Sequence, residues 1–350
     1  VVVIGLGKRG RHHAAAFRAN PRFELAGIAS RDPAALGKAA AELGNPRAST
    51  DAAALCREIR PDIFCFCTPP HVRLGLIRMG IESGAKLIAY EKPIALSMNE
   101  ALEIRGAVQA AGVRTVVSHQ HRYGQHYRKT HEIISSGTLG RVHTVYAHSA
   151  GWMTHLITHL VDLMRWYNGE ADAEWVMAQA AGRGKLTDTH PSPDFITGII
   201  QFANGVRGSI ECGAGAPDVP EVDYWWRKNR IGAQGTHGFA EALTGGGWRA
   251  VTPAGVQAGE GCMNYDLDMP PYVDQVADWL DDEAKVHPCN GESAHRGMEI
   301  VMGMLRSVVA RGQIALPLGP GEPELEALSR VLPEAPVLVS FAENRGQYPP

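Results

Sequence analysis

Three glycines spaced as G-x-G-x-x-G follow an apolar run at residues 1–4 and precede a helical pattern. Gly5 permits a tight turn, Gly7 leaves room for a phosphate close to the backbone, and Gly10 lets the helix pack close to the strand. Free N–H groups at the start of that helix favour a negative charge. The alternative is a glycine-rich turn in another kind of α/β protein. The segment predicts a dinucleotide pyrophosphate bound by Gly5, Gly7, Lys8, Arg9 and Gly10.

The end of the next predicted strand, at residues 25–29, bears on which dinucleotide binds. An acidic residue there would hold the ribose 2′-hydroxyl of NAD. The chain instead has Ser30, which has no charge to repel a 2′-phosphate, and Arg31, which could pair with one. These residues, with help from Arg9, favour NADP. NAD is the alternative, with Asp32 turned inward to hold the ribose.

Two further turns follow predicted strands of a parallel sheet, at the edge where cofactor and substrate meet. One turn is Thr68-Pro69-Pro70 and the other is Glu91-Lys92-Pro93. The proline fixes the second turn, so Lys92 would face the nicotinamide pocket in a rigid position. The competing interpretation is a surface salt bridge between Glu91 and Lys92. We expect the cofactor to contact Thr68, Pro69, Glu91 and Lys92.

A helical pattern at residues 155–166 carries His155, His159 and Asp162. The histidines are four residues apart and share a face, which the aspartate joins. Such a pair could bind zinc, but the glutamate of H-E-x-x-H and a third ligand are missing, so we predict no metal site. The competing interpretation of His159 is a buried, hydrogen-bonded core histidine.

The first 120 residues alternate strand patterns with helical patterns, which is typical of a doubly wound parallel sheet in an α/β fold. Glycines such as Gly84 and Gly112 separate these elements. We therefore predict a dinucleotide-binding Rossmann domain at residues 1–120. The expected strands are residues 1–4, 25–29, 63–67, 86–90 and 115–118, and the expected helices are residues 11–19, 33–43, 52–59, 72–83 and 99–111.

Residues 121–350 show a different pattern, with several strands joined by short turns such as Ala203-Asn204-Gly205. This predicts a second, α+β domain with a mostly antiparallel sheet and few helices. We expect strands at residues 141–148, 175–181, 196–202, 206–212 and 230–233, helices at residues 125–135 and 294–311, and an extended tail beyond residue 316.

Composition limits the class of protein. The 350 residues carry a formal net charge of −3, which gives no electrostatic reason to expect a nucleic-acid partner. No apolar run approaches the roughly 18 residues that span a membrane. The six cysteines contain no C-x-x-C, so we expect buried reduced thiols in a cytoplasmic protein. An open sheet with apolar strands favours a homodimer or homotetramer.

The chain resembles the Gfo/Idh/MocA oxidoreductase family along nearly its whole length. The resemblance implies a Rossmann domain and a C-terminal domain built on a large open sheet, one face of which often serves oligomerisation. It also implies hydride transfer between a nicotinamide and a carbinol carbon of a sugar, cyclitol or related polyol. Lys92 would bond the reacting hydroxyl, and His159 would be the general acid/base. The motifs that carry the resemblance lie at residues 5–10, 68–70, 91–93, 121–123, 136–140 and 155–166.

One position departs from the family pattern. The family usually has Asp-x-x-x-His on this helix, and His155 takes the place of the aspartate. A neutral imidazole would not stabilise charge on Lys92, so we expect the pKa of Lys92 to be lower than that of its counterparts in relatives. A lower pKa suits proton exchange near neutral pH. Alternatively, His155 binds an anionic group of the substrate, such as a carboxylate or sulfonate.

We expect a small, sugar-like substrate to lie against aromatic and basic side chains, because aromatic faces stack on sugar rings and arginine recognises anions. Two other histidines, His126 and His131, are expected on a solvated helix face. The residues predicted to bind substrate are His121, Arg122, Tyr123, Trp152, His155 and Arg227.

Three functions are compatible with these residues. The first is an NAD(P)-dependent sugar or polyol dehydrogenase or reductase. The second is an NAD-dependent redox-neutral glycoside hydrolase that works by oxidation, elimination, hydration and reduction, on a substrate that includes anionic sugar glycosides. Its extra base would be His155, His121 or Tyr123. The third is a non-enzymatic nucleotide sensor, which the presence of both Lys92 and His159 disfavours. The hydrolase would hold NAD tightly, whereas Ser30 and Arg31 favour an exchangeable NADP and therefore favour the dehydrogenase.

Overall fold

A computed structural model describes residues 1–334, except for the side chain of Trp225. The chain forms two compact units. Unit 1 contains residues 1–96, 100–123 and 265–295, and unit 2 contains the other described residues. The sequence placed a single boundary near residue 120. The chain leaves unit 1 after Tyr123 and returns to it at Tyr265.

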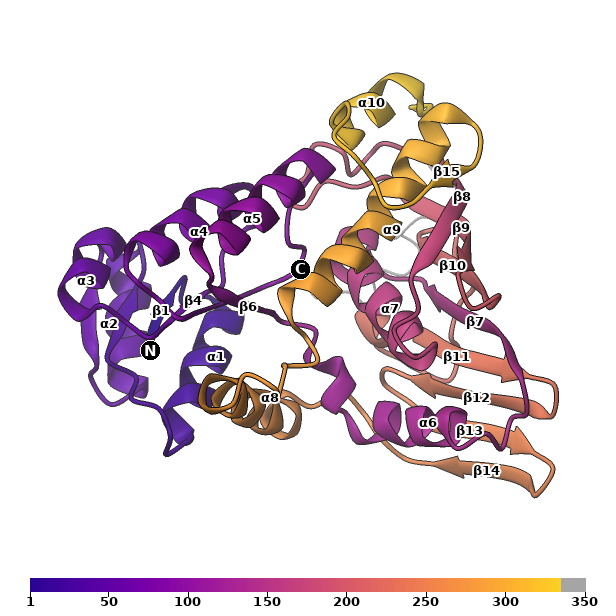
Figure 1. Cartoon of the computed structure of the whole chain (residues 1–350), viewed down its shortest axis with the longest axis horizontal. Helices are drawn as coiled ribbons and strands as arrows, with labels where there is room; N and C mark the ends of the chain where they lie inside the picture. The colour runs from indigo at the N-terminus through magenta and orange to yellow at the C-terminus, as the bar shows by residue number, and fades with distance from the viewer. Residues whose placement is uncertain (335–350) are drawn as a thin grey trace. The chain divides into compact units, whose positions relative to one another are not determined.

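Unit 1 is built on a six-stranded sheet with the order β3-β2-β1-β4-β5-β6. All of its strand pairs are parallel, which confirms the predicted doubly wound sheet. The strand order reverses between β1 and β4, and ligands of such sheets bind at the carboxyl ends of the strands near that point. The strands are β1 (Val2–Ile4), β2 (Gly27–Ala29), β3 (Arg47–Ser49), β4 (Ile63–Phe66), β5 (Leu87–Tyr90) and β6 (Arg114–Val117) (Figure 1).

The helices of unit 1 alternate with these strands, as the sequence predicted, except for one late helix. That helix, α8 (Tyr265–Asp281), contains Pro270 and Pro271. Because prolines are rare inside helices, the sequence pattern did not predict a helix there. Its Tyr272 and Val276 are fully buried in the core of unit 1. The others are α1 (Lys8–Ala19), α2 (Pro33–Glu42), α3 (Ala52–Ile59), the 3-10 turn η1 (Pro70–Val72), α4 (Arg73–Glu82), most of α5 (Met98–Ala111) and the 3-10 turn η2 (Gln120–Tyr123).

Unit 2 is built on a nine-stranded sheet with the order β14-β13-β12-β11-β7-β10-β9-β8-β15. Only the β7–β10 pair is parallel among these strands, so the mostly antiparallel prediction is confirmed. The strands are β7 (Val142–Ser149), β8 (Ala173–Ala181), β9 (Phe195–Phe202), β10 (Arg207–Gly213), β11 (Asn229–Gly235), β12 (Gly238–Leu243), β13 (Gly247–Thr252), β14 (Gly255–Gly259) and β15 (Ile314–Ala315).

Helices cover one face of this sheet (Figure 1). The helix α7 (Met153–Tyr167) packs on β7, β10 and β11, and α6 (Gln125–Ser135) packs on β12 and β13. The extended tail predicted beyond residue 316 is wrong for Glu324–Val331, which form the helix α10. Residues 335–350 of that tail lie outside the described residues. The chain also contains α9 (Gly291–Ala310) and the 3-10 turn η3 (Trp225–Arg227).

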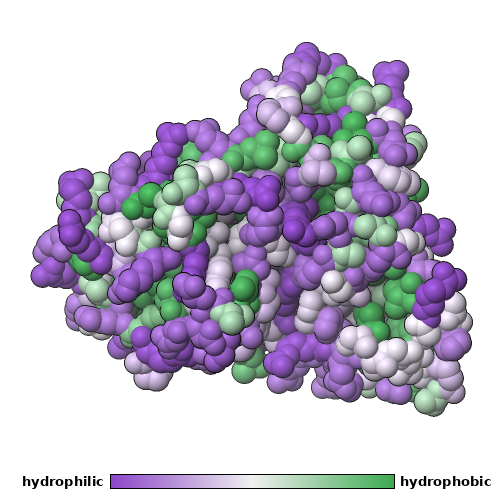
Figure 2. Space-filling model, in the orientation of Figure 1, coloured by the Kyte–Doolittle hydropathy of each residue, from purple (hydrophilic) through white to green (hydrophobic). Residues whose placement is uncertain are grey.

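The surface and the cysteines bear on the composition arguments. On the face drawn in Figure 2, hydrophilic residues separate small groups of hydrophobic ones. Within residues 1–334, no helix combines the length and apolar character needed to cross a membrane. Cys262 is exposed and Cys67 is partly exposed, so the expectation of buried thiols is wrong for Cys262. The cysteines that are buried are Cys56, Cys65, Cys212 and Cys289.

Candidate active site

The glycine turn between β1 and α1 leaves open space where a phosphate would lie. Gly5 has φ +84°, and a Cβ there would lie 2.4 Å from the carbonyl oxygen of Cys67. A Cβ on Gly10 would lie 1.8 Å from the carbonyl oxygen of Gly5, so α1 packs directly on the turn. A Cβ on Gly7, which caps α1, would meet nothing within 4 Å. These residues fit a pyrophosphate at the start of α1.

The residues after β2 bear on the two cofactor interpretations. Asp32 Oδ1 accepts hydrogen bonds from the backbone N–H groups of Ala34 at 2.9 Å and Ala35 at 3.2 Å. The aspartate therefore caps α2. Ser30 Oγ accepts from the N–H of Asp32 at 3.3 Å, and Arg31 is exposed. One oxygen of the carboxylate that the NAD interpretation invokes is thus engaged by its own helix.

The turn after β5 contains a buried carboxylate beside Lys92. Glu91 is only 8% exposed. Its Oε1 accepts from Arg9 Nε at 3.3 Å and lies 3.2 Å from His13 Nε2, which is also 3.2 Å from Ser118 Oγ. The Arg9 guanidinium lies 3.7 Å above the ring of Tyr265. Glu91 is therefore not an ordinary surface carboxylate, and Arg9 is directed to it rather than to the end of β2.

These charges set the ionisation of the turn. Burial, reinforced by Arg9 and Arg73 and opposed by Glu91, lowers the pKa of Lys92 from 10.5 to about 8. Burial opposes ionisation of Glu91, but Arg9 and the His13 hydrogen bond hold its pKa well below the usual range. The low pKa of Lys92 therefore has causes in unit 1 that the argument from His155 did not include.

Arg73, at the start of α4, joins the two turns that the sequence singled out. Its side chain is 1% exposed. Arg73 Nη1 donates to the carbonyl oxygen of Thr68 at 2.9 Å, Nε to that of Pro93 at 3.0 Å and Nη2 to that of Lys92 at 3.3 Å. Hydrogen bonds from a charged donor are stronger than neutral ones. The planar guanidinium therefore fixes the backbone at Lys92 and Pro93 and ties it to the turn at Thr68.

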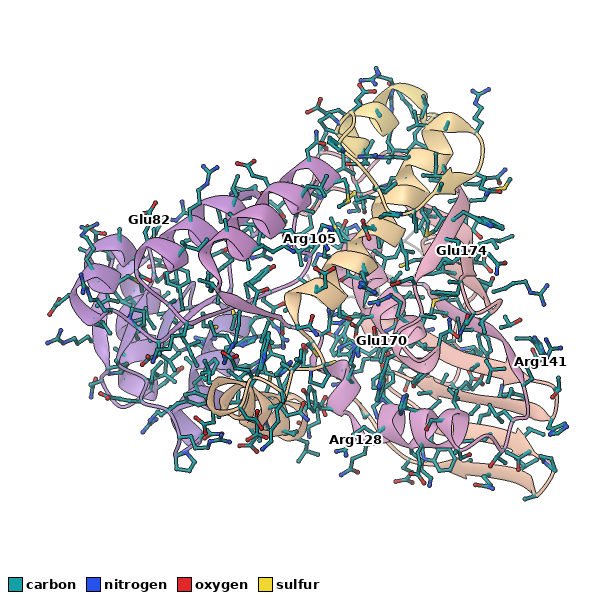
Figure 3. The ribbon with its side chains drawn as sticks, viewed as in Figure 1. Glu82, Arg105, Arg128, Arg141, Glu170 and Glu174 are labelled. Atoms are coloured by element: carbon teal, nitrogen blue, oxygen red, sulfur yellow. The ribbon has the colours of Figure 1, made fainter. Side chains whose placement is uncertain are left out.

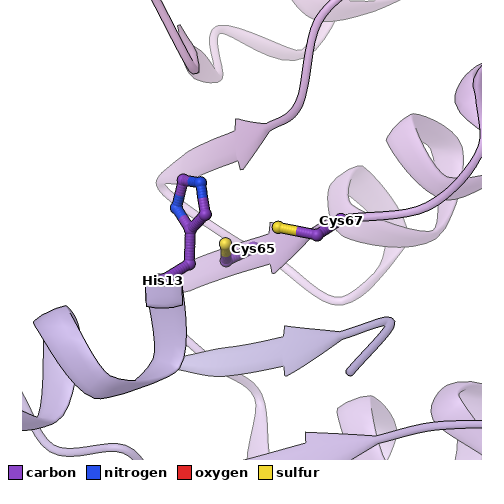
Figure 4. Close-up of side chains that lie close together, drawn as sticks. All are labelled: His13, Cys65 and Cys67. Carbon is purple, nitrogen blue, oxygen red and sulfur yellow. The ribbon is translucent and has the colours of Figure 1, made fainter. Parts of the chain in front are cut away.

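Two thiols lie beside His13 between α1 and β4 (Figure 4). The ligand atoms of His13, Cys65 and Cys67 all lie within 4.8 Å of one another. Burial alone would lower the pKa of His13, but Cys67 and the Glu91 carboxylate raise it to about 9. Burial raises the pKa of the Cys67 thiol well above its usual value, although His13 opposes this shift. Glu91 is then the anionic partner of His13.

The predicted histidine helix of unit 2 is α7, with Trp152 at its N-cap. His155 is partly buried, and His159 and Asp162 are 6% and 4% exposed. At the other end, Arg165 pairs at 3.1 Å with Glu170, which follows the helix and is labelled in Figure 3. The spacing of His155 and His159 places them one turn apart on a rigid, well-packed helix.

A group of aromatic and basic side chains surrounds the start of α7, and we call it the Trp152 cluster: Trp152, His155, Lys185 and His190. The rings of Trp152 and His155 are stacked, 5.0 Å apart and 5° from parallel. The ring of His190 lies 4.7 Å from that of His155, and Lys185 Nζ lies 4.2 Å from the centre of the Trp152 ring. Lys185 and His190 come from the loop between β8 and β9.

Both parts of the chain match models of known families. The model of an oxidoreductase family with an NAD-binding Rossmann fold matches residues 1–119. The model of the GFO/IDH/MocA C-terminal domain matches residues 147–241. The chain belongs to the Gfo/Idh/MocA oxidoreductase family. It therefore contains an NAD-binding Rossmann domain, as the glycine motif predicted.

Individual Gfo/Idh/MocA relatives are distant. Inositol 2-dehydrogenase of Rhizobium meliloti (strain 1021) is 25% identical over 222 residues, which cover 59% of this chain and 66% of that protein. The "1-carboxy-3-chloro-3,4-dihydroxycyclo hexa-1,5-diene dehydrogenase" of Comamonas testosteroni is 25% identical over 145 residues, 41% of this chain and 36% of that protein. The chain thus spans about one third to two thirds of these relatives.

Solved structures of oxidoreductases share the fold. An oxidoreductase from Agrobacterium radiobacter, in complex with NAD+, L-tartaric acid and magnesium, superimposes with a TM-score of 0.75. It is 17% identical, and the match covers 90% of this chain and 97% of that one. At this identity the likeness concerns the architecture, and it agrees with the two sheets described above.

The residues that the sequence grouped as substrate-binding fall in both units of this Gfo/Idh/MocA chain. His121, Arg122 and Tyr123 form η2 in unit 1 and are at most 9% exposed. Tyr123 Oη donates to Gln275 on α8, which favours a packing role. Trp152 and His155 lie in unit 2. Arg227, also in unit 2, stacks its guanidinium 4.8 Å over the ring of Trp226.

The predicted solvated face of α6 is wrong for His126. Its side chain is 1% exposed, lies against Tyr127 and Gly261, and has a pKa lowered to about 4 by burial. The cause is β12 and β13, two strands that the sequence did not predict and that cover this helix. His131 is partly exposed and stacks on Trp166 at 4.1 Å.

Several residues of the site escaped the sequence analysis. Nothing in the sequence indicated a role for Arg73, because a single arginine in a helical pattern is ordinary. His13 lies one helical turn after the glycine motif and could have been expected to face the same strand ends. Lys185 and His190 lie in a loop with no periodic pattern. Only the folded chain brings them to α7.

Proposed function

We propose that this chain is an NAD(P)-dependent oxidoreductase that transfers hydride between a nicotinamide and a carbinol carbon of a sugar, cyclitol or related polyol. The observation that carries the proposal is Lys92, which follows β5 at the sheet edge where such cofactors bind. Its turn is fixed by Arg73 and by the buried Glu91. The inositol 2-dehydrogenase relative supports this class of substrate.

The chain's own residues handle the substrate oxygen and its proton. A bound nicotinamide would accept or donate the hydride. With a pKa of about 8, Lys92 can be an amine or an ammonium near neutral pH, and either form can hydrogen-bond a reacting oxygen. His159 serves as the general acid/base for that oxygen, and His155 occupies the position of the usual aspartate.

NADP is the cofactor we propose as preferred. Ser30 carries no charge and Arg31 is exposed at the end of β2, where a 2′-phosphate would lie. The nearby carboxylate, Asp32, accepts the two capping hydrogen bonds of α2 on Oδ1, so its position is set by that helix. Arg9 is held by Glu91 and is not part of this proposal.

The test uses Lys92→Met and His159→Asn in a screen of inositols, aldoses and acidic polyols with NAD+ and NADP+. Acidic polyols belong in the screen because the Comamonas relative is named for a carboxylated substrate. We expect each variant to lose about 10²- to 10⁴-fold in kcat with little change in nucleotide affinity. The matched control is Lys86→Met, an exposed lysine paired with Asp62 at 2.7 Å before β5. Near-full activity in either site variant would refute the assignment.

The same preparation tests the redox-neutral glycoside hydrolase. Mass spectrometry of nucleotide released from the purified protein identifies what the site retains. Stoichiometric NAD, together with cleavage of aryl glycosides without net nucleotide reduction, would favour the hydrolase. Preferential binding of added NADP and net reduction by a polyol would favour the dehydrogenase.

A further inference from the structure

We propose that the Trp152 cluster is a subsite for a carboxylate or similar anionic group of the substrate, so that this enzyme acts on acidic polyols or sugar acids. The inference rests on the proposed function, because it assigns a substrate class to that same site. It extends to Lys185 and His190, two residues from a loop far from α7 in the sequence.

Within the Trp152 cluster, the Lys185 ammonium is a positive charge that no carboxylate of residues 1–334 neutralises by direct pairing. Lys185 Nζ has no ion-pair partner within 4.0 Å among residues 1–334 and lies instead over the Trp152 ring. His155 and His190, 4.7 Å apart, add two groups that can become cationic. An ammonium over an indole face is held in place but keeps its hydrogen-bond donors for an anion.

Acidic side chains near the cluster are turned to the loop itself. Asp194 accepts from the backbone N–H of Gly184 at 3.3 Å and of Lys185 at 3.0 Å, which fixes the start of the loop. Asp188 accepts from the backbone N–H of His190 at 3.0 Å and from Thr189 Oγ1 at 3.2 Å. Asp188 therefore positions His190 and leaves the Lys185 ammonium without a direct counter-ion.

Buried donors at the start of α7 also lack partners. Trp152 Nε1, Thr158 Oγ1 and Ser192 Oγ are buried and make no hydrogen bond within the described chain. The loop that holds Ser192 docks on the first turn of α7, because Thr154 Oγ1 donates to the carbonyl oxygen of Pro191 at 2.9 Å. Buried donors without acceptors cost free energy, and one of these donors, the indole N–H of Trp152, belongs to the cluster itself.

The position of the cluster relative to His159 indicates where the anionic group lies on the substrate. His155 and His159 are one turn apart on α7, which is about 6 Å along the helix axis. This separation is comparable to the width of a six-membered ring. The structure therefore points to a substrate whose carboxylate lies across a ring, or several carbons along a chain, from the hydroxyl that His159 serves.

The test compares hexuronates and aldonates with their neutral carboxamides, which match them in shape. We expect wild-type enzyme to show kcat/KM for the preferred acid at least about tenfold above that for its amide. Lys185→Met should lower this acid-to-amide ratio about tenfold and Lys185→Glu should lower it further, while the control Lys38→Met, an exposed lysine on α2, should leave it unchanged. An acid-to-amide ratio near one, or a ratio insensitive to Lys185, would overturn the subsite.

Direct binding separates this inference from the proposed function. Calorimetry with glucuronate, galacturonate and gluconate, each against its amide and with nucleotide present, requires no turnover. Tighter binding of an acid that is lost in Lys185→Glu supports the subsite even if no compound is oxidised, in which case only the proposed reaction fails. If the enzyme oxidises only neutral polyols, and if wild type and Lys185→Met each bind acids and amides equally, the subsite is overturned. The proposed reaction would still be supported in that case.

Discussion

Two neighbouring glycines of the cofactor turn have different constraints, so alanine substitutions should separate folding from binding. A Cβ on Gly10 would lie 1.8 Å from the Gly5 carbonyl oxygen, whereas ordinary contact begins at 3.4 Å, so the start of α1 would have to move by about 1.6 Å. Overpacking of this kind costs about 1–3 kcal/mol. A Cβ on Gly7 meets no protein atom within 4 Å and would project into the space proposed for the pyrophosphate.

We therefore expect Gly10→Ala to lower the free energy of unfolding by about 1–2 kcal/mol, because the higher helix propensity of alanine returns up to about 1 kcal/mol of the packing cost. Gly7→Ala should change stability by less than about 0.5 kcal/mol, because the lower entropy of its unfolded chain offsets the weaker cap. Its affinity for the dinucleotide should nevertheless fall at least about tenfold.

Urea unfolding and fluorescence titration with NADH and NADPH measure the two effects separately. The matched control is Gly37→Ala inside α2, where a Cβ also meets nothing within 4 Å. This control should be stabilised by about 0.5–1 kcal/mol and bind nucleotide normally. Wild-type stability in Gly10→Ala would refute the packing argument, and wild-type nucleotide affinity in Gly7→Ala would show that no phosphate approaches this turn.

Four other outcomes follow from contacts and charges described above. The pKa of Lys92 is lower in the folded chain than in the unfolded chain, so the unfolded chain binds more protons between about pH 8 and 10.5. Replacing the lysine in Lys92→Met should therefore raise the free energy of unfolding at pH 7 by at most about 3 kcal/mol, and this gain should fade as the pH rises through that range. A difference in unfolding free energy that does not depend on pH would contradict the assigned ionisation. Arg73→Met should destabilise the fold by about 3 kcal/mol and lower kcat, because three backbone carbonyls lose their charged donor, and an unchanged Tm would exclude that role. Arg31→Ala should weaken NADP(H) about tenfold more than NAD(H) in parallel titrations, and equal weakening would refute the cofactor preference. We also propose that copies of this chain associate through the face of the β8–β9 pair on which Met177 and Ile199 are half exposed. Replacing both residues by serine should lower the mass measured by light scattering, and an unchanged mass would place any interface elsewhere.

The sequence predicted those parts of the site that depend on short stretches of chain. The glycine turn, the Glu91-Lys92-Pro93 turn and the histidine helix each follow from neighbouring residues whose types restrict the backbone or the exposed face. The parallel sheet was likewise predictable, because its strands are buried and separated by helical patterns. The predicted location and general chemistry of the site rest on these features.

The contacts that tune this site could not be predicted, because they join residues distant in the sequence. Glu91 meets Arg9 across 82 positions, and Arg73 reaches Pro93 across 20. His126 looked solvated because the strands that cover it contain glycines and lack a strong apolar alternation. Burial and charge at these residues are properties of the folded chain, not of a local pattern.

The late return of the chain to unit 1 has a consequence for biosynthesis. The first 123 residues supply the whole nucleotide-binding sheet but not α8, whose Tyr272, Val273 and Val276 complete its core. At about 5–20 residues per second, a ribosome needs about 10–30 s more to reach the end of that segment. During this interval the nascent sheet exposes apolar surface, so we expect it to be a binding site for ribosome-associated chaperones.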